Sequence, residues 1–97
     1  MEERAVSEES AGFRVAGMVQ GVGFRQWTCR AGTDLGLRGA VRNLADGSVE
    51  VHVAGPVYAI ARLELRLADG PPSARVDRVE RASSSMPLPS RGFNIER

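Results

Sequence analysis

The hydrophobic pattern of this chain switches between two periods, and the order of the switches is the strongest constraint on its fold. Apolar side chains recur at every second position in some stretches, which is typical of β-strands, and at every third or fourth position in others, which is typical of α-helices. Strands are predicted over residues 12–19, 37–43, 49–54, 74–83 and 92–95, and helices over 24–35 and 56–69. The predicted order is therefore βαββαβ followed by a short terminal strand.

Glycine and proline mark the boundaries of these elements. Gly36 is the predicted C-cap of the first helix, and the Gly-Pro-Pro run at 70–72 ends the second one. The Asp46-Gly47 pair is a strong hairpin signal between the second and third strands. Pro56 suits the first position of the second helix, whose expected buried stripe is Val57, Ile60, Leu63 and Leu67.

This order of elements predicts one antiparallel sheet with both helices on one face. Right-handed crossovers and a single apolar face on each helix leave few other arrangements. The result is the split βαβ, or ferredoxin-like, α+β sandwich. The stretch 74–83 is dense in charge, so we expect it at an edge of the sheet. Many unrelated functions use this fold, so it does not by itself identify an activity.

Length and composition predict one small domain. The 97 residues suffice for a single core. Residues 1–10 carry four glutamates and no apolar run, so we expect a mobile acidic tail followed by a domain over 11–97. No stretch has the length of a membrane span or the pattern of a signal peptide, and the single cysteine, Cys29, excludes an intrachain disulfide. We expect a cytoplasmic monomer.

The charge balance argues against a nucleic-acid partner. Thirteen basic and twelve acidic residues give a net charge of +1, and aromatic residues make up 5% of the chain. A basic stripe or basic-aromatic motif for RNA is therefore not expected. All basic residues are arginines, which excludes lysine-dependent phosphate loops and Schiff-base chemistry and leaves the guanidinium as the strong anion ligand.

The turn between the first strand and the first helix is the most informative segment. Gly17, Gly21 and Gly23 allow backbone N–H groups to converge, and the helix N-terminus behind them adds positive potential. Arg25 in the first helical turn can add a bidentate fork to the same anion. This predicts a phosphate cradle, although the same glycines also suit a tight connection. The spacing matches neither the P-loop nor the dinucleotide fingerprint.

Asn43 is the second candidate, because it ends a strand on the same side as Val41. A polar amide in such a position needs partners, so it either caps the following turn or serves a site. Residue type and position alone leave both interpretations open.

Two segments resemble the signatures of the acylphosphatase family. Residues 17–25, GMVQGVGFR, resemble the first signature, and residues 39–50, GAVRNLADGSVE, resemble the second. The helix start at 55–56, its end at 70–72, the strand at 74–80 and the closing 93–95 also match in order. The likeness covers about residues 11–97, and the family has the ferredoxin-like fold already predicted from the hydrophobic pattern.

The resemblance implies hydrolysis of the carboxyl–phosphate anhydride of an acyl phosphate, with inorganic phosphate as product and inhibitor. Family members use no metal, no cofactor and no phosphoenzyme. Asn43 matches the asparagine that holds the attacking water, and Arg25 matches the arginine that closes the first signature. The phosphoryl group is expected in the loop made by Met18, Val19, Gln20, Gly21, Val22 and Gly23, together with Arg25.

The alternative is a non-enzymatic ferredoxin-like module that binds a small regulatory ligand. Such a module shares the topology but does not need Arg25 and Asn43 together. The remaining reactive side chains support neither reading. His52 has no second histidine for a metal site and is expected at the surface, and Cys29 is expected to be a structural thiol in the first helix.

Overall fold

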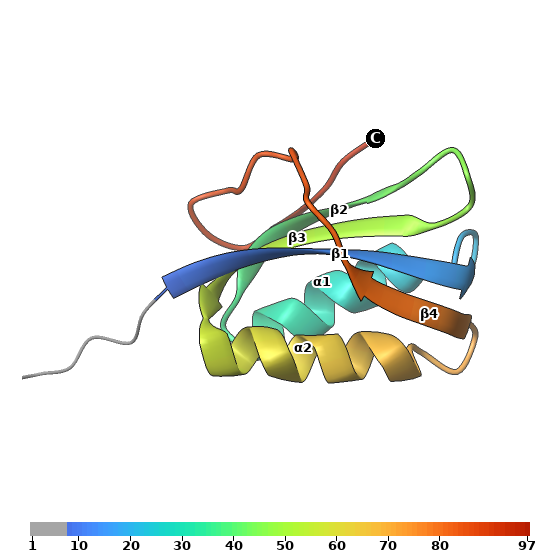
Figure 1. The fold of residues 1–97 in the computed structure, drawn as a ribbon, viewed down its shortest axis with the longest axis horizontal. Coiled ribbons are helices and arrows are strands. Elements are labelled where there is room, and N and C mark those ends of the chain that lie inside the picture. The colour runs from blue at the N-terminus through green and yellow to red at the C-terminus, as the bar shows by residue number, and fades with distance from the viewer. Residues whose placement is uncertain (1–7) are drawn as a thin grey trace, which may run out of the picture.

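Seven elements form in the predicted order in the computed structural model, which describes residues 8–97 (Figure 1). Both helices lie on one face of the sheet, so the ferredoxin-like α+β arrangement is confirmed. The elements are β1 (Glu8–Met18), α1 (Phe24–Asp34), β2 (Arg38–Asn43), β3 (Val49–Pro56), α2 (Val57–Asp69), β4 (Arg75–Arg81) and β5 (Phe93–Ile95).

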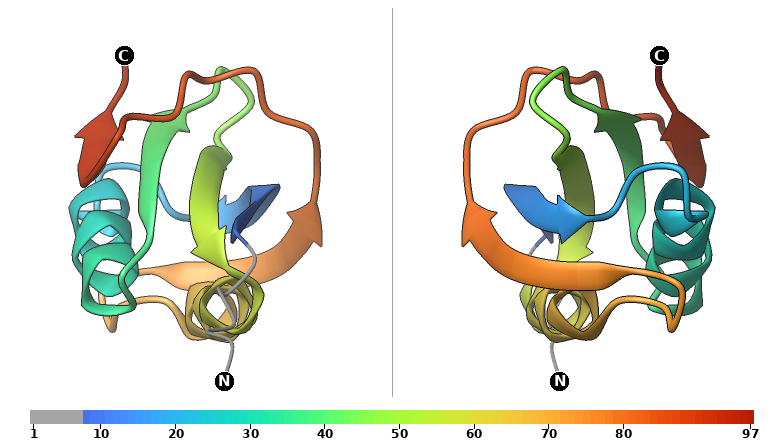
Figure 2. Two further views of the ribbon diagram at one scale, coloured as in Figure 1. Left: turned by 90° about the vertical axis from the view of Figure 1, so that its left-hand side faces the viewer. Right: turned by 90° about the vertical axis from the view of Figure 1, so that its right-hand side faces the viewer.

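The five strands lie in the order β4-β1-β3-β2-β5. The β1–β3, β1–β4 and β2–β3 pairs are antiparallel, as expected, and the predicted hairpin joins β2 to β3. The expectation of a purely antiparallel sheet is wrong for β5, which runs parallel to β2. The reason is the path of residues 82–92, which cross from the β4 edge to the β2 edge and so bring β5 in along the direction of β2 (Figure 2).

The prediction of a mobile acidic tail is wrong for residues 8–10. Glu8, Glu9 and Ser10 belong to β1 and pair with the last residues of β3. Backbone pairing with a neighbouring strand does not depend on apolar side chains, so the pattern of hydrophobicity did not reveal it. The remainder of the predicted tail, residues 1–7, lies outside the described residues.

The core fills the space between the sheet and the helices. Alternate residues of the central strands point into it, and α2 contributes Ala59, Ile60, Leu63 and Leu67. Val57 was expected in this stripe but is 49% exposed. It lies in the first helical turn, where side chains lean back past the helix start, and Pro56 is the N-cap rather than the first helical residue.

The other face of the sheet is covered by residues 82–92, which we call the strap (Figures 1 and 2). The side chain of Met86 is buried, and the Met86 carbonyl lies 2.6 Å from His52 Nδ1. Arg38 donates a hydrogen bond to the Pro89 carbonyl. His52, expected at the surface, is half-buried because the strap passes over it.

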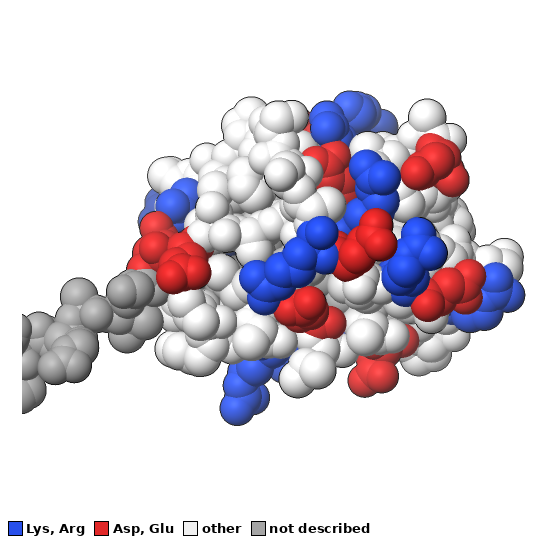
Figure 3. Space-filling view, in the orientation of Figure 1, with Lys and Arg blue, Asp and Glu red and all other residues white. Residues whose placement is uncertain are grey.

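The charged strand β4 lies at an edge of the sheet, as predicted. Arg75 pairs with Asp77 and Arg78 with Glu80 along the strand, and Arg81 reaches Glu64 on α2. The face shown in Figure 3 therefore carries mixed charges rather than a basic stripe. Within residues 8–97, no helix has the length and apolar character needed to cross a membrane.

The docking of β5 against α1 generates a stability prediction. A Cβ added at Gly32 would lie 2.3 Å from the Phe93 ring. Alanine normally stabilises a helix over glycine by about 1 kcal/mol. At this position we expect Gly32→Ala to destabilise the protein by about 1–3 kcal/mol, because the ring must move. Urea unfolding measures the difference.

The control is the same substitution in a Phe93→Ala background. With the ring removed, Gly32→Ala should become neutral or stabilising. Stabilisation by Gly32→Ala in the wild-type background would contradict the tight packing of β5 on α1.

Candidate active site

The connection from β1 to α1 depends on left-handed glycines. Gly21 has φ 76° and Gly23 has φ 79°, a region in which residues with a side chain are strained. A Cβ at either position would meet no atom within 4 Å, so these glycines are required by the backbone conformation and not by lack of space. The loop can therefore turn sharply and still leave its concave side open.

The N-terminus of α1 has no side-chain cap. Gly23 is the N-cap residue, and the Trp27 N–H makes the first helical hydrogen bond, to the Gly23 carbonyl at 3.0 Å. The N–H groups of residues 24–26 precede that bond and have no partner inside the helix. They give this end of the helix donors and a positive potential, both of which favour an anion.

A cavity of about 310 Å³ lies at this helix start. Four of the predicted loop residues line it: Val19, Gly21, Gly23 and Arg25. Arg25 is half-buried and makes no ion pair with any other residue in 8–97. The cavity thus combines a glycine loop, free helical N–H groups and a guanidinium, which is a donor set suited to a phosphoryl group.

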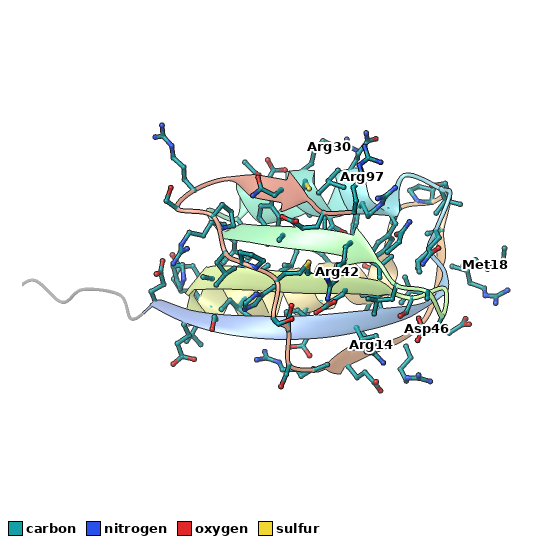
Figure 4. All side chains as sticks on the ribbon, turned by 90° about the horizontal axis from the view of Figure 1, so that it is seen from above. Arg14, Met18, Arg30, Arg42, Asp46 and Arg97 are labelled. Atoms are coloured by element: carbon teal, nitrogen blue, oxygen red, sulfur yellow. The ribbon has the colours of Figure 1, made fainter. Side chains whose placement is uncertain are left out.

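The other predicted loop residues do not line this cavity. Met18 is 59% exposed and lies at the outer end of β1 (Figure 4). The Val22 side chain packs against the core, and its carbonyl accepts a hydrogen bond from Ser73 Oγ at 2.8 Å. Even Val19, which lines the cavity, has its side chain buried in the core. The Val19 and Val22 side chains therefore anchor the loop to the body of the protein.

Gln20 points toward the β2–β3 turn. Its Nε2 donates to the Leu44 carbonyl and to the Ser48 carbonyl, both at 2.8 Å. These two residues also close the turn, because the Leu44 N–H donates to the Ser48 carbonyl. The glycine loop and the β2–β3 turn are therefore joined by one side chain.

Asn43 is the last residue of β2 and does not cap the turn. Its Oδ1 is buried without a hydrogen-bond partner among residues 8–97. The turn is capped instead by Asp46, whose carboxylate accepts hydrogen bonds from the Ser48 hydroxyl and from the Ser48 N–H. Both hydrogen bonds lower the pKa of the Asp46 carboxyl, the one from the hydroxyl more than the one from the N–H. The capping interpretation of Asn43 is wrong. The amide does not line the cavity, but it lies directly before the turn that Gln20 holds.

Two cavity residues come from the end of the chain and were not predicted. Ile95 and Arg97 line the cavity together with Arg25. Ile95, the last residue of β5, pairs in parallel with Val41 of β2, and Arg97 follows it by two residues. Figure 4 shows Arg97 on the side of the sheet where α1 and β5 lie. Ile95 and Arg97 could have been assigned to the site only if the direction of β5 had been known. The sequence of a three-residue strand does not show in which direction it pairs with its neighbour.

A second hollow, of about 430 Å³, is more open and lies along α1 near Phe93 and Arg66 of α2. It contains none of the predicted site residues.

Within the described part of the chain, no three His, Cys, Asp or Glu side chains come together as a metal-binding group. Burial raises the pKa of the Cys29 thiol in this second hollow, more than the charge of Arg30 lowers it.

Comparison with known proteins identifies the family. The acylphosphatase family model matches residues 11–95. An acylphosphatase of Nitrobacter hamburgensis is 54% identical over 66 residues, which are 68% of this chain and 67% of the relative. An acylphosphatase of Synechococcus sp. strain WH7803 is 48% identical over 83 residues, covering 86% of this chain and 81% of the relative.

Solved structures agree with the sequence comparison. The acylphosphatase of Coxiella burnetii superimposes with a TM-score of 0.82 at 34% identity and covers 92% of this chain and 93% of its own. The acylphosphatase of Bacillus subtilis gives 0.81 at 30% identity, covering 91% and 98%. The family model, the relatives and the fold agree over nearly the whole described chain, and this protein belongs to the acylphosphatase family, whose activity is the hydrolysis of acyl phosphates.

Proposed function

We propose that this acylphosphatase works by direct attack of water on the phosphoryl group, without a metal ion and without a phosphoenzyme. The observation that carries the proposal is the 310 Å³ cavity, in which the uncapped start of α1 meets the glycine loop and Arg25. No further group is needed to hold a phosphoryl oxygen there, because N–H donors and a guanidinium supply both hydrogen bonds and charge.

Arg25 and the free N–H groups of the loop and helix start bind the phosphoryl oxygens. Phosphoryl transfer spreads negative charge over these oxygens, so catalysis depends mainly on positioning and electrostatic stabilisation. Arg25 is half-buried and has no ion-pair partner among the described residues, so its charge is available to the ligand. Being partly shielded from water, it interacts with an anion more strongly than an exposed arginine does.

Asn43 holds the attacking water through its amide. The buried Oδ1 lacks a partner among residues 8–97, and a hydrogen-bond donor such as water would satisfy it. Holding the water in line with the scissile bond supplies the positioning that a bimolecular attack otherwise lacks.

The reaction needs no general acid on the protein. The bond that breaks joins phosphorus to a carboxylate oxygen, and a carboxylate leaves without protonation because its conjugate acid has a pKa of about 4. The amide of Asn43 is not a base at neutral pH, so the proton of the attacking water passes to the transferred phosphate. Inorganic phosphate, once formed, occupies the same donors and acts as an inhibitor.

The first prediction of the proposed mechanism concerns the reaction and its independence of metal. Purified protein should hydrolyse benzoyl phosphate, and an excess of EDTA should leave the rate unchanged because no step uses a metal. The fall in ultraviolet absorbance of the substrate measures the rate. Loss of activity in EDTA that Mg²⁺ restores would overturn the metal-free mechanism. A folded protein with no turnover would favour the ligand-binding module.

The second prediction concerns Arg25. Arg25→Gln keeps a polar side chain but removes the charge and fork, so kcat/KM should fall about 10²–10³-fold. The inhibition constant of inorganic phosphate should rise at least about tenfold, since 1.4 kcal/mol of lost binding suffices. Arg30→Gln, an exposed change on the same helix outside this cavity, is the matched control and should alter neither value. An unchanged phosphate inhibition constant in Arg25→Gln would exclude Arg25 as the anion ligand.

The third prediction concerns Asn43. Asn43→Ala should lower kcat about 10²-fold or more while changing the phosphate inhibition constant little, because the amide acts on water and not on the bound phosphoryl group. Asn94→Ala, at an exposed position of β5, is the control. Equal losses in kcat and phosphate affinity would contradict the assigned role.

A further inference from the structure

We propose that Gln20 is a positioning residue: its side chain aligns the Asn43 half of the site with the phosphate-binding loop. The inference rests on the proposed function, because it assigns phosphate binding to the glycine loop and water binding to Asn43. What it adds is the physical connection between these two halves, which come from segments more than twenty residues apart in sequence.

The contacts of Gln20 carry the inference. Both hydrogens of one Nε2 group are used, one by the Leu44 carbonyl and one by the Ser48 carbonyl, each at 2.8 Å. Both partners are carbonyl oxygens, which can only accept, so the orientation of the amide is determined by its chemistry. A side chain held at two points has little rotational freedom left and transmits the position of one segment to the other.

We call the two hydrogen bonds from Gln20 to the Leu44 and Ser48 carbonyls the clamp. Their acceptors lie at the two ends of the turn that follows Asn43. Leu44 follows Asn43 directly in the chain, and Ser48 precedes Val49, the cross-strand partner of Asn43. The two hydrogen bonds of Gln20 therefore hold the hairpin next to Asn43 and next to its cross-strand partner Val49. Gln20 itself lies between Val19 and Gly21, two residues that line the cavity.

The loop has a second anchor that does not reach Asn43. Ser73 Oγ donates to the Val22 carbonyl at 2.8 Å from the connection that follows α2. This bond holds the same loop against another part of the protein. The two anchors are similar in kind and in length, but only Gln20 joins the loop to the hairpin, so Ser73 provides a matched control.

The experiment is a double-mutant cycle on kcat with benzoyl phosphate. Gln20→Met keeps the length of the side chain and removes both donors. It should lower kcat about 10- to 100-fold, because a displacement of about 1 Å suffices for such a loss. The phosphate inhibition constant should stay within about twofold, since Arg25 and the N–H donors remain. In an Asn43→Ala background the same substitution should cost less than about threefold, because no water-holding amide is left to misplace.

Ser73→Ala separates this role from general support of the loop. Ser73→Ala should lower kcat by the same factor in the wild-type and Asn43→Ala backgrounds, because Ser73 does not act through Asn43. If Gln20→Met also costs the same factor in both backgrounds, or acts only on the phosphate inhibition constant, Gln20 is not a positioning residue. Gln20→Glu, which also loses the donors, replaces Gln20→Met in the cycle if the latter does not fold.

Amide hydrogen exchange separates failure of the clamp from failure of the proposed function. The Leu44 N–H is bonded to the Ser48 carbonyl inside the turn. It should exchange faster in Gln20→Met than in the wild type, and Ser73→Ala should leave it unchanged. Unchanged exchange in Gln20→Met would overturn the clamp whether or not acyl phosphates are hydrolysed. Absence of turnover in the wild type would reject the proposed function alone.

Discussion

The pairing of β1 with β3 is the interaction on which the whole site depends. Eight antiparallel pairs run from Glu8–Pro56 to Val15–Val49. Because strand side chains alternate, a slip of one residue would move Phe13 from the core to the opposite face of the sheet. The same register brings the segment that follows β1 next to the turn that precedes β3. The glycine loop and the hairpin therefore meet only because the core residues are in register.

The hydrophobic pattern was sufficient to predict the order of elements but not the path of the chain between them. Strand and helix periods are local properties, so the four long strands, both helices and the hairpin were predicted. The parallel direction of β5 depends on how residues 82–92 cross the sheet. That crossing is stabilised by single polar contacts, such as His52 with the Met86 carbonyl, which have no periodic signature.

Site residues that are close together in the sequence could likewise be predicted, whereas contacts between distant segments could not. The left-handed glycines and Arg25 lie within five residues of one another, so the sequence predicted a cradle for an anion there and left a tight connection as the alternative. Arg97 enters the cavity only through the parallel pairing of β5. The partners of Gln20 are main-chain carbonyls, and any residue type can supply those. Its side chain was therefore assigned to the phosphate loop, although it faces the hairpin.

The features that lower stability are concentrated at this end of the protein. The start of α1 has the glycine N-cap Gly23 and no side-chain cap, which costs roughly a few tenths of a kcal/mol against a capping Ser, Thr, Asp or Asn. The buried Asn43 oxygen has no partner among residues 8–97, and a buried acceptor that stays unsatisfied costs about 1–3 kcal/mol. Elsewhere a buried polar group is satisfied locally, as when the Thr28 hydroxyl donates to the Phe24 carbonyl. On the proposed mechanism the two deficits have a common reason: a capped helix would have fewer N–H groups for a phosphoryl oxygen, and an amide bonded within the protein could not hold the water that attacks it.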